Sequence, residues 1–487
     1  MRTGHLGIDL GTSSVKVVVQ DNTGHVLAKA SRAYDTLALL PGWAEQSPEA
    51  WWQATSAAVS EAVVGVEILS VGLSGQLNGF VLLDAANAPL CDAVIWLDLR
   101  AEIEAKELLA ESGLDIEALT GNDLSPVSVL SKLVWFARQR PDVLARTRRI
   151  VFVKDYILMR LTGEHATDPS DAGSTAMACP GGAFWQPELV ARTGLPLSAL
   201  PTILPSAAIA GRVTSAASQA TGLVSGTAVA TGAGDVAALA VGCGIVEPAR
   251  VAITLGTAGH VVAQADGAAM PRNSGLWCIP HAVPQRTLWL GLIMSGGLCL
   301  AWLRELLCAV GTPLDFAQIE TLAAAAPVGG RGVNFLPFLE GAATPHRRPD
   351  ARGAFFGLSS SHDAGDMLRA VMEGVAFNAR ECVDALAAGG VDPTEIRLAE
   401  GGSQSQIWCQ TMADALARPV DLLAERDTSA VGAAILGHAA VEGASVAEIA
   451  NTSVRLTRRF EPSAAGVATL NEGFSRYTDT IRRLLGP

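Results

Sequence analysis

Residues 6–20, LGIDLGTSSVKVVVQ, place one carboxylate, Asp9, in an apolar run and follow it at once with glycine, threonine and serine at positions 11–13. A glycine turn lets backbone N–H groups approach an anion closely, and the two hydroxyls add further donors. The same letters are also typical of a plain strand, turn and strand in which Asp9 is hydrogen-bonded within the turn. Taken alone, the segment does not distinguish a phosphate loop from a structural hairpin.

A second stretch, residues 251–262 with the sequence VAITLGTAGHVV, repeats this pattern about half of the chain later. Each copy reads as an apolar strand, a Gly-Thr turn and another apolar strand, and a repeat at half-length suggests two like domains. Two such loops facing each other would hold a polyphosphate from both sides. Only the first copy carries a carboxylate, as a Mg²⁺–phosphate complex needs, since Mg²⁺ prefers oxygen ligands and keeps several waters.

A further carboxylate, Asp235, stands in the sequence ATGAGDVAALAVG, between an apolar run and a run of small residues. The segment contains G-x-G-x-x-A, but a dinucleotide-binding loop is disfavoured because no acidic residue follows about 20 positions later to hold a ribose. One interpretation is structural, a helix N-cap aspartate. The other is chemical, a general base near the ends of strands, where α/β proteins bind their ligands.

Composition and charge limit the classes of function. The formal net charge is −13 and no basic run occurs, which argues against non-specific binding to nucleic acid or to an anionic membrane surface. The most apolar region, 228–246, is short and carries Asp235, and strands begin within the first ten residues, so neither a membrane span nor a signal peptide is expected. The eight cysteines lack a CxxC spacing and the eight histidines lack a paired spacing, which favours a cytoplasmic protein without zinc.

The hydrophobic pattern predicts the elements that must position these groups. Residues 1–30 read as three strands with a turn at 21–24, and Ser47 and Pro48 mark the start of a helix. Residues 365–388 predict a long helix with its apolar positions on one face. Further predictions are a strand, turn and strand at 68–84, helices at 128–140 and 142–163 around a short strand at 149–153, a strand, turn and helix at 227–244, a helix at 295–309, and a strand, turn and helix at 396–416.

Strands that alternate with helices in both halves predict an α/β fold. Residues 245–250, IVEPAR, are the expected boundary. The sequence thus predicts an N-terminal domain of residues 1–244, with the first phosphate loop, and a C-terminal domain of residues 245–487, with the second.

Several long stretches resemble the FGGY carbohydrate kinases of the actin-like ATPase superfamily, and among them the xylulokinases most. The segment from Gly353 to Glu373 fits the C-terminal signature of the family throughout. The resemblance implies two actin-like ATPase (ribonuclease H-like) domains with a cleft between them. The stretches that carry it are GIDLGTSSVKV (7–17), GWAEQSPEAWW (42–52), LSGQLNGFVLLD (73–84), KDYILMRLTGE (154–164), GAGDVAALAVG (232–242), LGTAGH (255–260), LPFLEGAATPHRRPDARGAFFGL (336–358) and GGSQSQIWCQTMADAL (401–416).

The resemblance implies a role for each residue that matches a family motif. Asp9 would coordinate Mg²⁺, and Asp235 would be the catalytic base that accepts the proton of the sugar's terminal hydroxyl. The residues implied to hold ATP are Gly11, Thr12, Ser13, Gly256, Thr257, Gly401 and Gly402. The residues implied to hold the sugar are Gln76, Leu77, Asn78, Asp98 and Arg100, together with Asp235.

Departures from the xylulokinase pattern cluster around the sugar. That pattern has histidine at Asn78, asparagine at Leu97 and Val236, serine at Ala258 and glycine at Glu400. The activity class is therefore better supported than the substrate. The predicted reaction is ATP-dependent phosphorylation of the terminal hydroxyl of a ketopentose, D-xylulose to D-xylulose 5-phosphate. The alternatives are an FGGY kinase for ribulose, a pentitol or another polyol, and an actin-like ATPase that uses nucleotide only to switch conformation.

The implied ligands follow from this reaction. ATP and Mg²⁺ are the expected cofactors, and a small sugar is the expected partner. The family suggests a homodimer, whereas nucleic acid and membranes are not expected partners.

Overall fold

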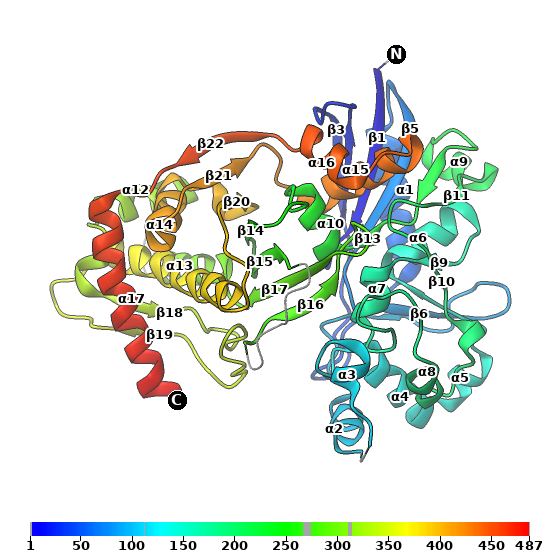
Figure 1. The fold of residues 1–487 in the computed structure, drawn as a ribbon, viewed down its shortest axis with the longest axis horizontal. Coiled ribbons are helices and arrows are strands. Elements are labelled where there is room, and N and C mark those ends of the chain that lie inside the picture. The colour runs from blue at the N-terminus through cyan, green and yellow to red at the C-terminus, as the bar shows by residue number, and fades with distance from the viewer. Residues whose placement is uncertain (1, 112, 266–273, 310–313, 487) are drawn as a thin grey trace. The chain divides into compact units, whose positions relative to one another are not determined.

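The computed structural model describes residues 2–111, 113–265, 274–309 and 314–486. Its contacts divide the chain into two compact units (Figure 1). Unit 1 consists of Met1–Val246, Cys278–Leu288 and Asp427–Val454, and unit 2 of Glu247–Trp277, Trp289–Arg426 and Arg455–Pro487. Two segments from the second half of the chain therefore pack with the first half.

Unit 1 is built on a mixed sheet of order β11-β12-β5-β1-β2-β3, with β13 beside β5. The hairpin β1–β2 is antiparallel, β5 runs parallel to β1, and β12 runs parallel to β5. The three strands and the turn predicted for residues 1–30 are confirmed. The strands are β1 (Arg2–Leu10), β2 (Ser14–Gln20), β3 (Val26–Ala33), β5 (Val66–Gly75), β11 (Ile209–Arg212), β12 (Ala228–Ala230) and β13 (Ala233–Gly234).

A second sheet has the order β16-β17-β15-β14-β20-β21-β22, and all of it belongs to unit 2 except the residues of β16 and β17 that lie within 278–288. Its hairpin β14–β15 is antiparallel, β20 runs parallel to β14, β21 runs parallel to β20, and β22 is antiparallel to β21. The same succession of pairings runs through β2, β1, β5, β12 and β11 of unit 1, so the sequence repeat is a repeat of the fold. The strands are β14 (Arg250–Leu255), β15 (Gly259–Gln264), β16 (Trp277–Pro280), β17 (Thr287–Ile293), β20 (Glu395–Ala399), β21 (Val420–Leu423) and β22 (Leu456–Phe460).

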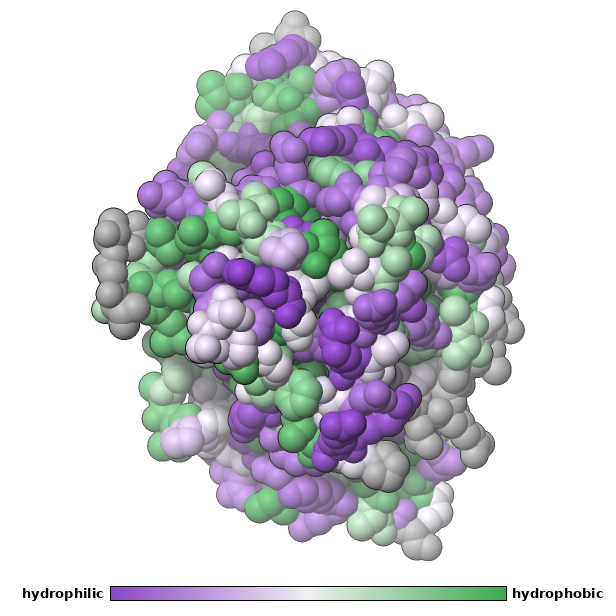
Figure 2. All heavy atoms as spheres, turned by 90° about the vertical axis from the view of Figure 1, so that its left-hand side faces the viewer, coloured by the Kyte–Doolittle hydropathy of each residue, from purple (hydrophilic) through white to green (hydrophobic). Residues whose placement is uncertain are grey.

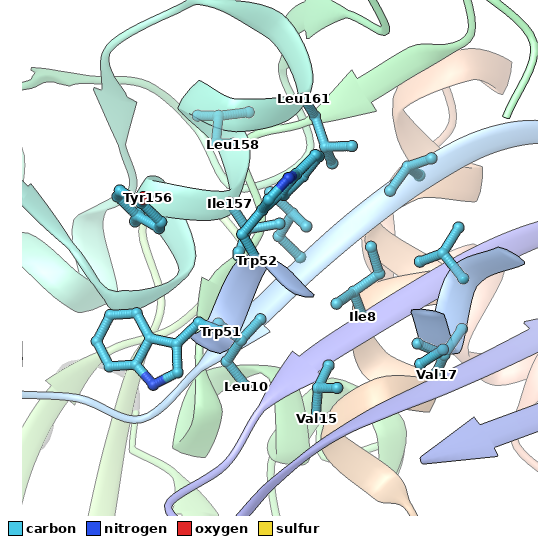
Figure 3. Packing of buried hydrophobic residues seen from close by; sticks show 14 of the residues in the cluster. Ile8, Leu10, Val15, Val17, Trp51, Trp52, Tyr156, Ile157, Leu158 and Leu161 are labelled. Atoms are coloured by element: carbon cyan, nitrogen blue, oxygen red, sulfur yellow. The ribbon is translucent and has the colours of Figure 1, made fainter. Parts of the chain in front are cut away.

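Helices cover both faces of the unit 1 sheet. Side chains alternate between the faces of a strand, so Ile8 and Leu10 of β1 lie on the face that packs against Trp51 and Trp52 of α1 (Pro48–Ala62), as Figure 3 shows. The helix α6 (Val153–Thr162) completes this core. The predicted start of α1 is confirmed, because the Ser47 side chain accepts a hydrogen bond from the N–H of Ala50.

The opposite face is covered by α15 (Thr428–Glu442), which comes from the second half of the chain. A Cβ placed on Gly7 of β1 would lie 1.9 Å from the carbonyl oxygen of Ala430, and one on Gly72 of β5 would lie 1.8 Å from that of Ala433. A Cβ on Gly432 of α15 would lie 1.8 Å from a backbone oxygen of α10 (Asp235–Gly242). We call these contacts the glycine seam. It brings the backbone of α15 directly onto the sheet and onto α10.

The remaining helices and short strands of unit 1 surround this sheet. The predicted helices at 128–140 and 142–163, with a short strand between them, are found as α4, α5, β8 and α6. The elements are α2 (Glu102–Ala110), α3 (Ile116–Thr120), α4 (Val129–Gln139), α5 (Pro141–Arg146), α7 (Pro169–Ser174), α8 (Pro187–Arg192), α9 (Ser215–Thr221), α16 (Val446–Ser453), β4 (Glu45–Gln46), β6 (Phe80–Leu83), β7 (Ala93–Val94), β8 (Arg149–Phe152), β9 (Ala166–Thr167) and β10 (Thr202–Ile203).

In unit 2 the long predicted helix is α13 (Ala364–Ala388), and every apolar residue of its predicted face is buried. The other elements are α11 (Gly297–Ala309), α12 (Phe316–Ala325), α14 (Gln406–Leu416), α17 (Ala464–Leu485), β18 (Asn334–Leu336) and β19 (Ala354–Phe356). The surface in Figure 2 intersperses hydrophilic and hydrophobic residues. Within the described ranges, no helix is long and apolar enough to cross a membrane.

Candidate active site

The β1–β2 turn is held by side chains from three other segments of unit 1. The Tyr34 hydroxyl donates to the carbonyl of Gly11, and Gln46 Nε2 donates to the carbonyl of Thr12 at 2.6 Å. The indole N–H of Trp96 donates to Thr12 Oγ1 at 3.0 Å. An indole nitrogen only donates, so the Thr12 hydroxyl must accept this bond and keeps its own proton to donate to an anion. Sequence reasoning missed these three supports, although two of them lie in the GWAEQ and WLDLR stretches.

Asp9 lies near the end of β1, beside this turn. Its side chain is buried, and Ser74 Oγ, from the register partner on β5, donates to Asp9 Oδ1 at 2.8 Å. Burial raises the pKa of Asp9 above the ordinary aspartate value, because burial penalises the charged form; the hydrogen bond from Ser74 and the charge of Lys16 oppose this shift. A cation beside Asp9 would stabilise the same charged form.

Asp235 is the first residue of α10, and the N-cap position belongs to Gly234. The interpretation of Asp235 as the N-cap residue is therefore wrong, although its Oδ1 accepts the N–H of Val236 at 2.8 Å within the first turn. The residue is half-buried at the end of the short strand β13. This location, at a strand end and a helix start, suits a base that must reach a bound ligand.

A buried ionic cluster holds the backbone just before Asp235. Ser170 Oγ accepts the N–H of Gly234 at 2.9 Å and donates to Asp168 Oδ2 at 2.6 Å. Asp168 Oδ1 lies 3.2 Å from Lys154 Nζ, which also pairs with Asp155 and Asp171. Burial alone would lower the pKa of Lys154, but the three carboxylates raise it, and burial raises the pKa of Asp171. Sequence reasoning missed this cluster; the only signal was the density of aspartates in residues 154–171.

The predicted sugar-binding residues Gln76, Leu77 and Asn78 form the turn after β5, which we call the acceptor turn. A Cβ on Gly234 would lie 2.1 Å from Leu77 Cδ2, so the acceptor turn packs against the residue before Asp235. Asn78 has a φ of 60°, and its carbonyl accepts a hydrogen bond from Lys132 Nζ at 3.1 Å. Burial lowers the pKa of Lys132 to about 7. The structure therefore brings the acceptor turn and Asp235 together.

Asp98 and Arg100 satisfy each other. Asp98 is fully buried and accepts hydrogen bonds from Arg100 Nε at 2.8 Å and from the N–H of Ala44 at 2.7 Å. The Arg100 guanidinium also bonds Glu45 and lies over the ring of Trp43, 3.8 Å from its centroid. In this conformation Asp98 and Arg100 hydrogen-bond each other and the neighbouring residues Ala44 and Glu45. Direct contact of either residue with a sugar stays a prediction.

The β14–β15 turn of unit 2 is supported mainly by backbone. The N–H of Gly297, at the start of α11, donates to the carbonyl of Gly256 at 2.7 Å, and the N–H of Gly296 donates to that of Thr257 at 3.0 Å. A Cβ on Gly402 would lie 2.5 Å from Leu255 Cβ, so the 401–402 turn, predicted to hold ATP, packs beside this loop. The predicted ATP-binding residues of the second half therefore lie together.

Glu400, which precedes that turn, is the departure from the family pattern with the clearest structural effect. It has φ 68° and ψ −162°, a region that is essentially restricted to glycine. Its Oε2 lies 2.3 Å from where a Cβ of Gly256 would be. A carboxylate thus lies against the second predicted phosphate loop.

Two family models and several relatives match this chain. Residues 5–242 match the N-terminal domain of the FGGY family of carbohydrate kinases, and residues 251–441 match its C-terminal domain. The xylulose kinase of Escherichia coli (strain K12) is 33% identical over 442 residues, 90% of each chain. The crystal structure of xylulose kinase from Rhodospirillum rubrum has a TM-score of 0.89 and 32% identity over 99% of each chain. A gluconokinase of Bacillus subtilis (strain 168) is 28% identical over 89% of this chain and 86% of its own.

Both family domains are thus present, in order, across nearly the whole chain, and relatives match it from end to end. The two-domain α/β fold expected from the sequence is confirmed by the solved structure at this level of similarity. The chain belongs to the FGGY family of carbohydrate kinases.

Proposed function

We propose that this protein is an ATP-dependent xylulokinase, which transfers the γ-phosphate of ATP to the terminal hydroxyl of D-xylulose and gives ADP and D-xylulose 5-phosphate. The similarity to xylulose kinases in sequence and structure supports the substrate. The observation that carries the site is the packing of the acceptor turn against the residue before Asp235, where Leu77 Cδ2 lies 2.1 Å from a Cβ built on Gly234.

In this proposal Asp235 accepts the proton of the attacking hydroxyl, which contributes roughly 10²–10⁴-fold to the rate. Most of the remaining catalysis is positioning and charge stabilisation. The N–H groups of the two predicted phosphate loops, with the hydroxyls of Thr12 and Thr257, would bind the phosphates. The Lys154 cluster would keep the backbone of Gly234, and with it Asp235, at a constant distance from the acceptor turn.

Asp9 fits a Mg²⁺ site. It is one buried carboxylate whose charged form is disfavoured without a cation, and Mg²⁺ is commonly held by one or two carboxylates plus substrate phosphates. Bound with ATP, Mg²⁺ would neutralise part of the phosphate charge. Asp9 would hold its waters in place through an oxygen that Ser74 orients.

The test is a coupled ADP-release assay over D-xylulose, D-ribulose, pentitols, glycerol and gluconate, with the product identified by ³¹P spectroscopy. We expect the highest kcat/KM for D-xylulose and a 5-phosphate product. A higher kcat/KM for another sugar would show that this sugar is the substrate, and the protein would still be a sugar kinase. ATP hydrolysis that no sugar stimulates would instead favour an actin-like ATPase.

A kinase for another polyol is the second candidate, because Asn78, Leu97 and Val236 replace polar residues of the xylulokinase pattern. Each lost hydrogen bond would cost about 0.5–1.5 kcal/mol, or roughly three- to tenfold in affinity. We expect D-xylulose to bind with a high KM that Asn78→His lowers. If Asn78→His instead leaves D-xylulose kinetics unchanged and removes activity on another polyol, that polyol is the substrate.

We also propose a cytoplasmic homodimer, as the family resemblance and the cysteine pattern suggest. Size-exclusion chromatography with light scattering tests the dimer, and fractionation of the source cells tests the location. A monomeric mass at micromolar concentration would reject the dimer.

A further inference from the structure

We propose that Gln46 locks the side-chain amide of Gln76 in one orientation, so that Gln76 presents only a hydrogen-bond acceptor and selects a sugar hydroxyl donor. This inference rests on the proposed function, because it concerns the same acceptor turn. It makes Gln46 a positioning residue and Gln76 a specificity-determining one. The substrate class that it selects is a neutral polyhydroxy compound with a free hydroxyl at one defined carbon.

The orientation of Gln46 follows from its neighbours. The indole N–H of Trp51 donates to Gln46 Oε1 at 3.0 Å, and an indole nitrogen cannot accept. On the other side Gln46 Nε2 donates at 2.6 Å to the carbonyl of Thr12, which cannot donate. Turning the Gln46 amide over would place its NH₂ against an N–H and its oxygen against a carbonyl oxygen. Gln46 is fully buried, so water cannot relieve either conflict.

The orientation of Gln76 follows from that of Gln46. Gln76 Nε2 donates to the same Gln46 Oε1 at 2.9 Å. If the Gln76 amide turned over, two oxygens would face each other. The backbone of Gln76 is also held, since its N–H donates to the carbonyl of Leu10 at 2.9 Å. The chain Trp51–Gln46–Gln76 therefore has one allowed arrangement.

That arrangement leaves one atom unsatisfied. Gln76 is 1% exposed, and its Oε1 has no hydrogen-bond partner among the described residues. A buried acceptor without a partner is costly, so a donor that arrives there gains binding energy that an acceptor-only group cannot. The Oδ1 of Asn78, two residues on, is buried and unpartnered in the same way. The acceptor turn therefore contains two buried acceptor oxygens for which the described residues supply no donor.

The nearby cations already make hydrogen bonds within the protein. Arg100 bonds Asp98 and Glu45, and Lys132 Nζ donates to the carbonyls of Asn78 and Ile95 at 3.1 and 2.7 Å. A substrate carboxylate beside the acceptor turn would meet amide oxygens and pre-engaged cations. This arrangement favours a ketose or polyol over an aldonic acid such as gluconate.

The test uses monodeoxy and deoxyfluoro analogues of D-xylulose, because fluorine accepts weakly but never donates. We expect one position at which both analogues lose about three- to tenfold in kcat/KM relative to the parent sugar. In Gln76→Met, which removes the amide but keeps the length, that loss should shrink to within about twofold. Discrimination at the other positions should persist.

Two substitutions of Gln46 separate positioning from general damage. Gln46→Glu keeps an oxygen that accepts from Trp51 and Gln76, whereas Gln46→Met keeps none. The discrimination against the deoxyfluoro analogue should therefore survive in Gln46→Glu and disappear in Gln46→Met, while the KM for ATP rises in both because the Thr12 contact is altered. Gln53→Met, on the exposed side of α1, is the matched control and should change neither quantity by more than about twofold.

The outcomes are distinguishable from failure of the proposed function. The inference is wrong if folded Gln76→Met keeps the full discrimination against the analogues. It is also wrong if the deoxyfluoro analogue recovers the activity that the deoxy analogue loses. In both cases the proposed kinase activity is unaffected. If D-xylulose is not phosphorylated, the same analogues of the sugar identified in the screen decide the question. If Gln46→Met does not fold, the comparison of the parent protein with Gln76→Met decides it alone.

Discussion

The β1–β2 and β14–β15 turns have the same backbone plan but different surroundings. The first is supported by side chains, those of Tyr34, Gln46 and Trp96, and has the buried carboxylate of Asp9 beside it. The second is supported by the backbone at the start of α11 and has a carboxylate, Glu400, lying against its glycine. The two units repeat one fold, and the first loop is connected to the acceptor turn.

The connection runs through Gln46, which bonds both Thr12 and Gln76. We therefore predict that unit 1 contacts both the sugar and the phosphates, and that unit 2 contacts the nucleotide; these roles stay predictions.

The largest expected effect separates two aspartates at helix starts, Asp235 of α10 and Asp427, which precedes α15. We expect Asp235→Asn to lose at least about 10²-fold in kcat, with ATP binding and the fold retained. Asp427 pairs with the partly exposed Lys16 and Lys29, so Asp427→Asn should cost less than about fivefold. Steady-state kinetics and calorimetric ATP titration measure both. Near-normal turnover in folded Asp235→Asn would reject the base.

The next effect concerns the two glycines. Gly11→Ala and Gly256→Ala should each raise the KM for ATP roughly 10–100-fold and the KM for sugar much less, because a methyl would displace phosphate from charge-assisted hydrogen bonds. The nearest atom to a Cβ on Gly11 is Ser14 O at 3.3 Å, so that variant should fold. A rise confined to the sugar KM would refute the two-loop nucleotide site.

A smaller effect is expected at Glu400, the carboxylate that lies against the β14–β15 turn. Glu400→Gly should stabilise the protein by about 1 kcal/mol, because relief of backbone strain exceeds the entropic cost of glycine. It should also lower the KM for ATP about fivefold, since a unit charge 4 Å from another contributes ~1 kcal/mol even in water. Glu400→Gln, which removes the charge but keeps the strain, should change only the KM. A higher KM in both variants would make the carboxylate a favourable contact instead.

The smallest effect compares equivalent positions near the start of β1 and β14. His5 bonds Ser70 and stacks on His438 of α15, whereas Arg250 pairs with Glu395. Burial, reinforced by His438, lowers the pKa of His5 to about 4. Between pH 6.5 and 4 the unfolded chain therefore binds a proton that the folded chain does not, and stability falls as the pH falls.

We expect His5→Gln to flatten this slope, measured as the urea midpoint at pH 6.5, 5.5 and 4.5. Arg250→Gln is the matched control, because arginine does not titrate in this range and its slope should equal that of the parent. If the urea midpoint depends on pH equally in the parent, His5→Gln and Arg250→Gln, a group other than His5 causes the pH dependence.

Elements with a strong local pattern could be predicted from the sequence. Both hairpins, the Ser47 cap and the buried face of α13 depend on periodicity and capping within a few residues. The predicted site residues also fall into two neighbourhoods, one in each unit. The Lys154 cluster and the Trp51–Gln46–Gln76 chain could not be predicted, because each depends on pairing between segments that are distant in sequence and carry no periodic signal.

The position of α15 could not be predicted from the sequence either. Its small residues indicate a buried helix, yet nothing in residues 428–442 indicates that this helix packs on β1 and β5, where the paired residues Gly7–Ala430 and Gly72–Ala433 are 423 and 361 positions apart. The first segment of unit 1 ends at Val246, but residues 278–288 and 427–454 also belong to that unit, so the single division expected at residues 245–250 stays a prediction. Backbone contacts at glycines leave no apolar pattern in the sequence from which the partner of α15 could be predicted.

The glycine seam has a consequence for how the protein is made. A ribosome completes the sheet of unit 1 long before it reaches residues 428–442, so the nascent chain exposes the glycine-lined face of β1 and β5 while unit 2 is synthesised. Contacts of such sequence separation form late, and uncovered strands are prone to association. A fragment ending at residue 246 should therefore be aggregation-prone, and a chaperone that holds the emerging sheet should improve the yield. A 1–246 fragment that is monodisperse and unfolds cooperatively would show instead that the sheet of unit 1 folds stably without α15.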